Sequence, residues 1–386
     1  MYNIKTLNKI AKCGLDELPG DKFLVSEAEG NPDGVLVRSF VMDDSTLTPN
    51  LKCIGRAGAG VNNIPVDECA KRGIVVFNTP GANANAVKEL VVAGLMLCSR
   101  NIHAGINWVQ SLQGQEGVAA TVEKGKADFA GPEITGKTLG VIGLGAIGGI
   151  VANAANALGM KVVGYDPFLS EELAAKLSPD VQKVDSEDAV AAASEYLTIH
   201  APMTAKTKHK FNAEFFAKCK KGVKILNFSR AELVDNVALL AAIADGTVSC
   251  YVTDFPTEDL LGNDKIITIP HLGASTPESE DNCATMAAAQ VREYLLYGNI
   301  KNSVNFPDLY EPRGAGARLC IFHRCVENIG SEFHNILEES GVAVESSASA
   351  HKGDLAYTII NLDGDHDKLE GRLSELEGVI AVRRIQ

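Results

Sequence analysis

The sequence predicts an α/β protein of several domains, and three observations carry that prediction. Short apolar runs alternate with helix-like segments over most of the chain, as they do where helices cover a parallel sheet. Residues 138–166 hold a G-x-G-x-x-G spacing between two of these runs. Residues 317–386 instead follow the order βαββαβ, which predicts a ferredoxin-like unit. A chain of 386 residues also exceeds one ordinary hydrophobic core, so two or three domains are expected.

Composition narrows the possible partners. The formal net charge of −13 argues against binding to nucleic acid or to an anionic membrane surface. The nine cysteines are scattered without a C-x-x-C pair, and no histidine cluster has metal-ligand spacing, so we expect reduced thiols and no metal. The sequence shows no signal-peptide pattern and no apolar run of membrane-spanning length, so we expect a cytoplasmic protein without a membrane partner.

The first 92 residues read as a small parallel α/β domain whose loop 55–62, GRAGAGVN, follows an apolar strand. Its alternating small residues, among them Ala59 and Gly60, allow successive backbone N–H groups to converge on an anion, and Arg56 adds a positive charge. A flexible turn with a surface arginine explains the loop equally well. On the anion interpretation, the loop and Arg56 bind a negatively charged part of a substrate. Two residues that end the next strand are expected to line the same cleft, Asn78 and Thr79.

Residues 86–109 predict one largely apolar helix, buried between domains or subunits, in which Trp108 serves packing. Residues 124–137 predict a polar connector that leads into the next strand.

The glycine spacing at Gly143, Gly145 and Gly148 ends the apolar run 139–144. The first glycine permits a tight turn, the second lets the backbone approach a pyrophosphate, and the third lets the next helix pack closely on the strand. The free N–H groups that open this helix, near Ala146 and Ile147, then face an anion.

Asp166 ends the following strand, where a carboxylate accepts hydrogen bonds from an adenosine ribose. Because a carboxylate there repels a 2′-phosphate, we expect NAD and not NADP as the cofactor. A glycine spacing alone often marks an ordinary turn, but the full succession of strand, helix, strand and acid predicts a Rossmann domain.

Later apolar runs at 196–200, 223–228, 250–254 and 266–269 predict further parallel strands, and ligands bind at the carboxyl ends of such strands. Arg230 follows one of these ends and is a candidate to bind a carboxylate or polarise a carbonyl. His271 follows another and is placed for proton transfer near neutral pH. Glu258 and Asp259 lie between them and are candidates to orient the imidazole, whereas His200 is interpreted as structural.

Several stretches together resemble one known family. They are GRAGAGVNNIPVDECAKRGIVVFNTPGANANAVKEL, the glycine fingerprint, LNFSRAELVD, DFPTE and PHLGAST, followed by GNIKNSVNFP and the βαββαβ tail. This combination is similar to the D-isomer-specific 2-hydroxyacid dehydrogenases that carry a C-terminal ACT domain. The resemblance implies a flavodoxin-like substrate domain, residues 1–92 completed by 283–307, around an inserted NAD-binding Rossmann domain, residues 93–282. A linker at 308–316 and an ACT-like regulatory domain at 317–386 complete the chain.

The resemblance also implies roles for single residues. Arg230 binds the substrate carboxylate and carbonyl, Glu258 supports His271, and His271 is the acid and base. Groups at the strand ends border the nicotinamide half of NAD: Thr79, Ala201, Phe228, Ser229, Arg230, Asp254, His271, Gly273 and Ala274. The implied reaction is NAD-dependent oxidation of 3-phospho-D-glycerate by a homodimer or homotetramer, with an amino-acid effector possible at the ACT-like domain.

Three departures from the family pattern bear on these roles. Ser229-Arg230-Ala231-Glu232 replaces the usual Ala-Arg-Gly-Gly, so the turn after the arginine loses its glycines. Asp254 is followed directly by Phe255, one residue shorter than usual, which leaves Asp259 a rival to Glu258. Glu327-Asn328-Ile329-Gly330 replaces the usual Asn-x-Pro-Gly turn, so inhibition by serine is not carried over.

Two other functions stay open at this point. Another D-2-hydroxyacid dehydrogenase, such as a hydroxypyruvate or glyoxylate reductase, has the same motifs and differs in its preference for a phosphorylated substrate. A non-catalytic NAD-sensing protein has the same fold and would not need Arg230, Glu258 and His271 together.

Overall fold

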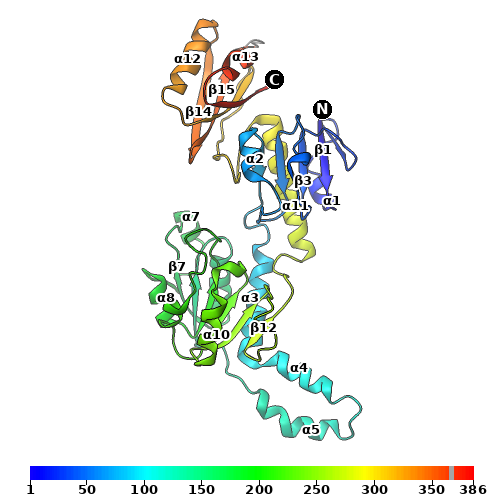
Figure 1. Ribbon diagram of the computed structural model, residues 1–386, viewed down its shortest axis with the longest axis vertical. Coiled ribbons are helices and arrows are strands. Elements are labelled where there is room, and N and C mark those ends of the chain that lie inside the picture. Colours follow the sequence, from blue (N-terminus) through cyan, green and yellow to red (C-terminus); the bar gives the residue numbers. More distant parts are fainter. Residues whose placement is uncertain (365–368) are drawn as a thin grey trace. The chain divides into compact units, whose positions relative to one another are not determined.

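A computed structural model describes residues 1–364 and 369–386, so the first four residues of the helix expected over 365–376 lie outside the described part. The chain divides into two compact units. Unit 1 comprises Met1–Asn83 and Pro277–Gln386, and unit 2 comprises Ala84–Thr276. Figure 1 labels elements of both units. The α/β fold class is confirmed, while the exact domain boundaries drawn from the sequence stay a prediction.

The N-terminal part of unit 1 is a five-stranded parallel sheet of order β2-β1-β3-β4-β5, the flavodoxin-like order. Its strands are β1 (Tyr2–Leu7), β2 (Phe23–Ser26), β3 (Gly34–Val37), β4 (Cys53–Arg56) and β5 (Val75–Phe77). The shorter helices are α1 (Lys12–Leu15), η1 (Asp44–Thr46) and α2 (Val66–Lys71).

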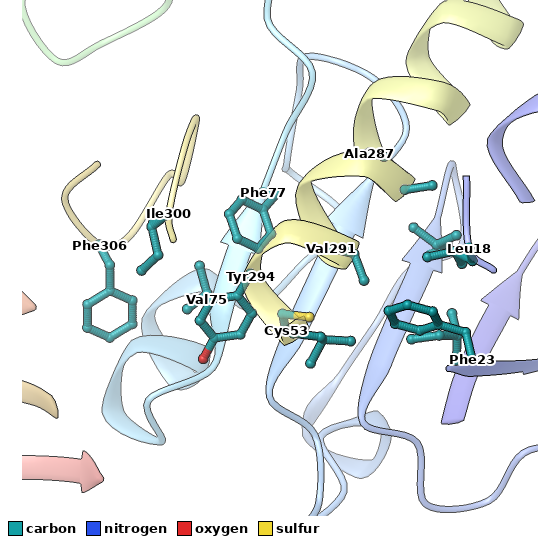
Figure 2. Close-up of a cluster of buried hydrophobic side chains, with 14 of the residues drawn as sticks. Leu18, Phe23, Cys53, Val75, Phe77, Ala287, Val291, Tyr294, Ile300 and Phe306 are labelled. Carbon is teal, nitrogen blue, oxygen red and sulfur yellow. The ribbon is translucent and has the colours of Figure 1, made fainter. Parts of the chain in front are cut away.

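The long helix α11 (Pro277–Tyr297) covers one face of this sheet. Figure 2 shows Val291 and Tyr294 of this helix among Cys53, Val75 and Phe77 of the strands. A Cβ on Gly55 of β4 would lie 2.8 Å from Val291 and 3.2 Å from the carbonyl of Ala287, so a glycine there permits the helix to approach. The residues after 276 therefore complete the core of the first domain.

Unit 2 is built on a seven-stranded parallel sheet of order β12-β11-β10-β9-β6-β7-β8, which is the Rossmann arrangement with one further strand. The strands are β6 (Thr138–Ile142), β7 (Lys161–Tyr165), β8 (Val181–Lys183), β9 (Tyr196–Ile199), β10 (Val223–Asn227), β11 (Val248–Thr253) and β12 (Ile266–Thr268). The helices around them are α3 (Ala84–Arg100), α6 (Gly148–Ala157), α7 (Glu171–Ala174), α8 (Glu187–Ala193), α9 (Ala213–Phe216), η3 (Ala231–Leu233) and α10 (Asn236–Ala244).

The prediction of a single helix over 86–109 is wrong. The helix α3 ends at Arg100, Asn101 takes the left-handed conformation with φ 48°, and α4 (Ile102–Ser111) begins after it. Burial is confirmed for α3 only, because none of the residues of α4 is buried. The connector expected over 124–137 is helical at its start, in α5 (Val118–Gly125) and η2 (Lys126–Phe129). Trp108 packs as expected, with its ring 5.0 Å from that of Phe129.

The C-terminal part of unit 1 is a four-stranded antiparallel sheet of order β14-β15-β13-β16, the predicted ferredoxin-like arrangement. Its elements are β13 (Arg318–Arg324), α12 (Ile329–Glu339), β14 (Val344–Lys352), β15 (Leu355–Leu362), α13 (Leu369–Ser374) and β16 (Val379–Ile385). Alternate residues of β13 contribute side chains to two different hydrophobic cores. Leu319 and Ile321 pack with α12 and α13, whereas Cys320 and Phe322 join the core that contains α11.

Candidate active site at the strand ends of the Rossmann domain

The three glycines of the loop after β6 meet different requirements: some permit the turn and the packing of α6, and one leaves a side of the loop open. Gly143 has φ 89°, and a Cβ on Gly148 would lie 1.8 Å from the carbonyl oxygen of Gly143, so both glycines serve the turn and the packing of α6. A Cβ on Gly145 would meet no atom of the described residues within 4 Å other than those of its chain neighbours. The open side of the loop thus lies at Gly145, beside Ala146 and Ile147, where the first turn of α6 leaves N–H groups without helical acceptors.

Asp166, directly after β7, is tied to this loop. Its Oδ2 accepts a hydrogen bond from the N–H of Leu144 at 2.9 Å, and its Oδ1 accepts one from the N–H of Phe168 at 2.8 Å. A carboxylate offers about four acceptor sites, so each oxygen can accept a further bond, as from a ribose hydroxyl.

The turn that carries Arg230 is held by Asn227, a fully buried residue at the end of β10. Asn227 Oδ1 accepts from the N–H of Ser229 at 3.1 Å, and Asn227 Nδ2 donates to the carbonyl of Arg230 at 2.9 Å. Asn227 Nδ2 also donates to the hydroxyl of Tyr251 at 3.2 Å. Sequence reasoning missed Asn227 as a positioning residue, although it sits at a strand end two residues before Ser229.

Asp254 follows β11 and lies close to His271. Its Oδ2 accepts from the N–H of Gly273 at 3.1 Å, and only 1% of the residue is exposed. Burial raises the pKa of Asp254, while the Gly273 N–H and the positive charge of His271 act in the opposite direction. Asp254 Oδ1 is shielded from solvent and has no hydrogen-bond partner within residues 1–364 and 369–386.

The imidazole of His271 is exposed and packs against the ring of Phe255, with 4.8 Å between the ring centroids. No hydrogen bond or ion pair joins it to Glu258 in the described part of the chain. Asp259, the rival acid, is engaged elsewhere, because its Oδ1 accepts from Thr257 Oγ1 at 2.5 Å and from Asn236 Nδ2 at 3.3 Å. The support of His271 by Glu258 stays a prediction.

His200 lies at the end of β9, and its Nε2 is 3.0 Å from Thr198 Oγ1. Burial lowers its pKa to about 4, so the ring is neutral at physiological pH. This environment suits the structural role expected for it. Two further predicted neighbours of the cofactor are Ala201, which lies next to the turn at Gly143, and Phe228, which packs against α3.

The anion loop predicted at residues 55–62 belongs to unit 1. A Cβ on Gly58, which has φ 145°, would lie 1.3 Å from Arg56 Nη1, so the guanidinium folds over this glycine. Asn78 Nδ2 donates to the carbonyl of Ala59 at 2.7 Å, and the N–H of Thr79 donates to the carbonyl of Gly58 at 3.1 Å. Asn78 and Thr79 therefore shape the loop as well as border it.

The structure brings Ser229, Arg230, Asp254, His271 and Gly273 together at adjacent strand ends of unit 2, with Ala274 in the loop that follows. Ser229 Oγ bonds the carbonyl of Ile199 at 2.8 Å, which links the ends of β9 and β10. The residues of the anion loop lie in the other unit.

The residues of unit 2 fit a dinucleotide. Asp254 Oδ1 is a buried acceptor that protein donors leave unused, the loop is open at Gly145, and Asp166 retains acceptor capacity. Among the described residues, no group of three His, Cys, Asp or Glu side chains is placed to hold a metal ion. No helix in the described ranges is both long and apolar enough to cross a membrane.

Comparison with known proteins identifies this domain. Residues 92–273 match the family model described as D-isomer specific 2-hydroxyacid dehydrogenase, NAD binding domain. A solved structure of NAD+-bound 3-phosphoglycerate dehydrogenase from Entamoeba histolytica superimposes with a TM-score of 0.62 at 27% identity, over 80% of this chain and 99% of that one. Unit 2 thus matches the NAD-binding domain of this family.

Curated relatives extend the likeness to most of the chain. D-3-phosphoglycerate dehydrogenase of Bacillus subtilis is 31% identical over 374 residues, which is 92% of this chain and 68% of that protein. The enzyme of the same name from Methanocaldococcus jannaschii is 35% identical over 325 residues, 81% of this chain and 59% of that protein. The chain thus spans from about three fifths to two thirds of the length of these relatives.

Proposed function

The chain belongs to the D-isomer specific 2-hydroxyacid dehydrogenase family, and we propose that it oxidises 3-phospho-D-glycerate to 3-phosphooxypyruvate with NAD, the first step of serine biosynthesis. The observation that supports the chemistry is the position of Arg230, Asp254 and His271 just after the carboxyl ends of the adjacent strands β10, β11 and β12. The substrate is inferred from the names of the relatives.

His271 and Arg230 divide the work on the substrate. The His271 imidazole removes the proton of the C2 hydroxyl, and its exposed ring leaves it accessible to a ligand. The Arg230 guanidinium binds the substrate carboxylate and stabilises the charge that develops on the C2 oxygen. Arg230 Nη1 donates to the carbonyl of Ser229 at 2.6 Å, which leaves the other guanidinium N–H groups for the substrate.

NAD, when bound, would supply the acceptor for the hydride of C2. Asp166 would hold its adenosine ribose, the glycine loop with Ala146 and Ile147 would hold its pyrophosphate, and the unpartnered Asp254 Oδ1 would be an acceptor for its nicotinamide half. Glu258 is proposed to orient His271 once the substrate is bound, because Asp259 is already held by Thr257 and Asn236.

The anion loop is proposed to share the substrate carboxylate with Arg230 and to bind the phosphate. Backbone N–H groups at residues 58–61, with Ala59 and Gly60, hold the carboxylate, and Arg56 holds the phosphate. The buried Oγ1 of Thr79 has no hydrogen-bond partner in the described residues, which suits a polar ligand at this edge.

The decisive experiment measures NADH formation from 3-phospho-D-glycerate and from unphosphorylated D-glycerate. We expect a clear preference for the phosphorylated acid, lost in Arg56→Ala, and no turnover in His271→Ala. Equal rates on the two acids would indicate another D-2-hydroxyacid dehydrogenase. Unchanged turnover in His271→Ala would sink the assigned chemistry and favour an NAD-sensing protein.

We also propose a homodimer or homotetramer in a reducing, cytoplasmic compartment. Ile102, Ile106 and Val109 form one apolar stripe on α4 and are exposed by 41%, 54% and 42%. Figure 1 shows α4 and α5 extending away from the sheet of unit 2. All nine cysteines are free thiols. Light scattering of Ile106→Lys tests the assembly, since a monomeric variant is expected and an unchanged mass would contradict this interface.

A further inference from the structure

A cavity of about 650 Å³ lies in unit 1 between its parallel sheet, the end of α11 and the C-terminal antiparallel sheet. None of the residues proposed to bind substrate or NAD lines it. Its walls come from β1, the turn before β2, the last turn of α11, the segment before β13, α13 and β16. Parts of the chain that are far apart in sequence therefore share this space.

The polar lining of the cavity is mainly cationic. Lys22, Arg313 and Arg384 line it, and Glu370 is the one acidic residue among the described residues of the wall. Tyr2, Tyr297 and Gln386 complete the polar part of the lining. This local excess of positive charge contrasts with the formal net charge of −13 of the whole chain.

The hydrogen bonds of Arg313 indicate which kind of ligand the cavity wall can bind. Its Nη2 donates to the carbonyl of Ile385 at 3.2 Å, which fixes the plane of the guanidinium. Its Nη1 is shielded from solvent and has no acceptor among residues 1–364 and 369–386. A buried charged donor without an acceptor is costly, and a planar guanidinium matches the paired oxygens of a carboxylate or phosphate.

We propose that this cavity binds a small organic dianion, a phosphate monoester or a dicarboxylate, in contact with Arg313, Arg384 and Lys22. Three cationic side chains against one carboxylate side chain match a ligand of about two negative charges. The volume exceeds that of a bare phosphate, so the cavity has room for the carbon skeleton that bears the charges.

The bound anion joins the C-terminal sheet to the first domain. Lys22 belongs to the first domain, whereas Arg384 belongs to β16 of the C-terminal sheet. Tyr297 ends α11 between them. An anion that contacts both sides stabilises their association and raises the stability of unit 1 by mass action.

Isothermal titration of the full chain tests the site at constant ionic strength, with glycerol 2-phosphate and with succinate as separate probes. The Arg56→Gln/Arg230→Gln background removes both cations that are proposed to bind the substrate. We expect one equivalent of at least one probe to bind and to raise the unfolding temperature. Binding of the phosphate ester or of the dicarboxylate alone then identifies the source of the anion.

Arg313→Gln is expected to weaken binding by about tenfold or more, the loss typical of one charged hydrogen bond. If Arg313→Gln does not fold, Lys22→Gln is the second test variant, because Lys22 is exposed and its replacement should not disturb folding. Arg324→Gln removes an exposed arginine outside the cavity and is expected to bind as the parent does. Absence of saturable binding, tighter binding of the zwitterion serine than of either dianion, or an unchanged affinity in both Arg313→Gln and Lys22→Gln overturns the proposal.

Discussion

Asn227 Nδ2 donates a hydrogen bond to the backbone carbonyl of Arg230 at 2.9 Å, and this bond shapes the turn that presents the arginine. The same side chain accepts from the N–H of Ser229, so it spans the turn from both ends. A chain with Ala231 and Glu232 in place of the family's glycines thus holds the turn through a buried amide.

Replacing Asn227 by Asp should lower turnover and, because the new carboxylate is buried, also stability. The carboxylate still accepts from Ser229 N–H but no longer donates to Arg230, so the guanidinium is less well placed, and we expect kcat/KM to fall by about tenfold. The KM for the hydroxy acid should rise while the KM for NAD changes little. Steady-state kinetics with circular dichroism measures both; equal rises in the two KM values would show a general disturbance instead.

Two glycines of the fingerprint should respond differently to alanine. Gly148→Ala places a methyl against the carbonyl of Gly143, so we expect clear loss of stability without any ligand. Gly145→Ala meets no atom of the described residues within 4 Å other than those of its chain neighbours, so its unfolding temperature should match the parent. Its affinity for NAD should nevertheless fall, because the methyl occupies the side where the pyrophosphate approaches.

Thermal unfolding without NAD and calorimetric titration with NAD separate these two effects. Unaltered NAD affinity in Gly145→Ala would place the pyrophosphate elsewhere.

His200 should make the protein less stable in acid. Its pKa is about 4 in the folded protein against 6.5 when unfolded, so the unfolded state binds more protons between these values. The free energy of unfolding therefore falls as the pH drops from 6.5 towards 4, by up to roughly 3 kcal/mol from this residue. Above pH 6.5 the histidine adds no pH dependence.

Urea unfolding between pH 4 and pH 7 measures this slope. His200→Gln, which does not titrate, should show a shallower loss than the parent, whereas His351→Gln at an exposed position should not. The same slope in His200→Gln and the parent would contradict the buried neutral histidine.

Arg383 of β16 should be needed for the docking of the C-terminal sheet on α11. Its Nη1 donates to the carbonyl of Tyr294 at 3.1 Å, its Nη2 donates to Leu295 O and to the hydroxyl of Tyr2, and the guanidinium lies 4.9 Å from the Tyr294 ring. These carbonyls belong to the last turn of α11, where a cation also favours the helix dipole.

Arg383→Met should therefore cost about 2 kcal/mol or more, because these acceptors lose their donor in a buried place. Arg324→Met on the neighbouring strand β13 is the control, since its pair with Asp354 is exposed and worth little. The urea midpoint measures both variants; equal midpoints would mean that the sheet docks without Arg383.

Local patterns in the sequence were sufficient to predict the fold class and to propose most of the site residues. The glycine spacing, the acid after β7 and the strand-end positions of Arg230 and His271 depend on backbone stereochemistry and on the direction of parallel strands, which short stretches encode. The order βαββαβ was likewise legible from hydrophobic periodicity.

What the tertiary structure decided are the pairings of distant residues. The clamp of Asn227 on Arg230 with Tyr251, the closeness of Asp254 to His271, and the contact of Arg383 with α11 all depend on packing between remote segments. No local pattern specifies such contacts, because each is stabilised by the loss of water around both partners, and that occurs only when the folded chain brings them together.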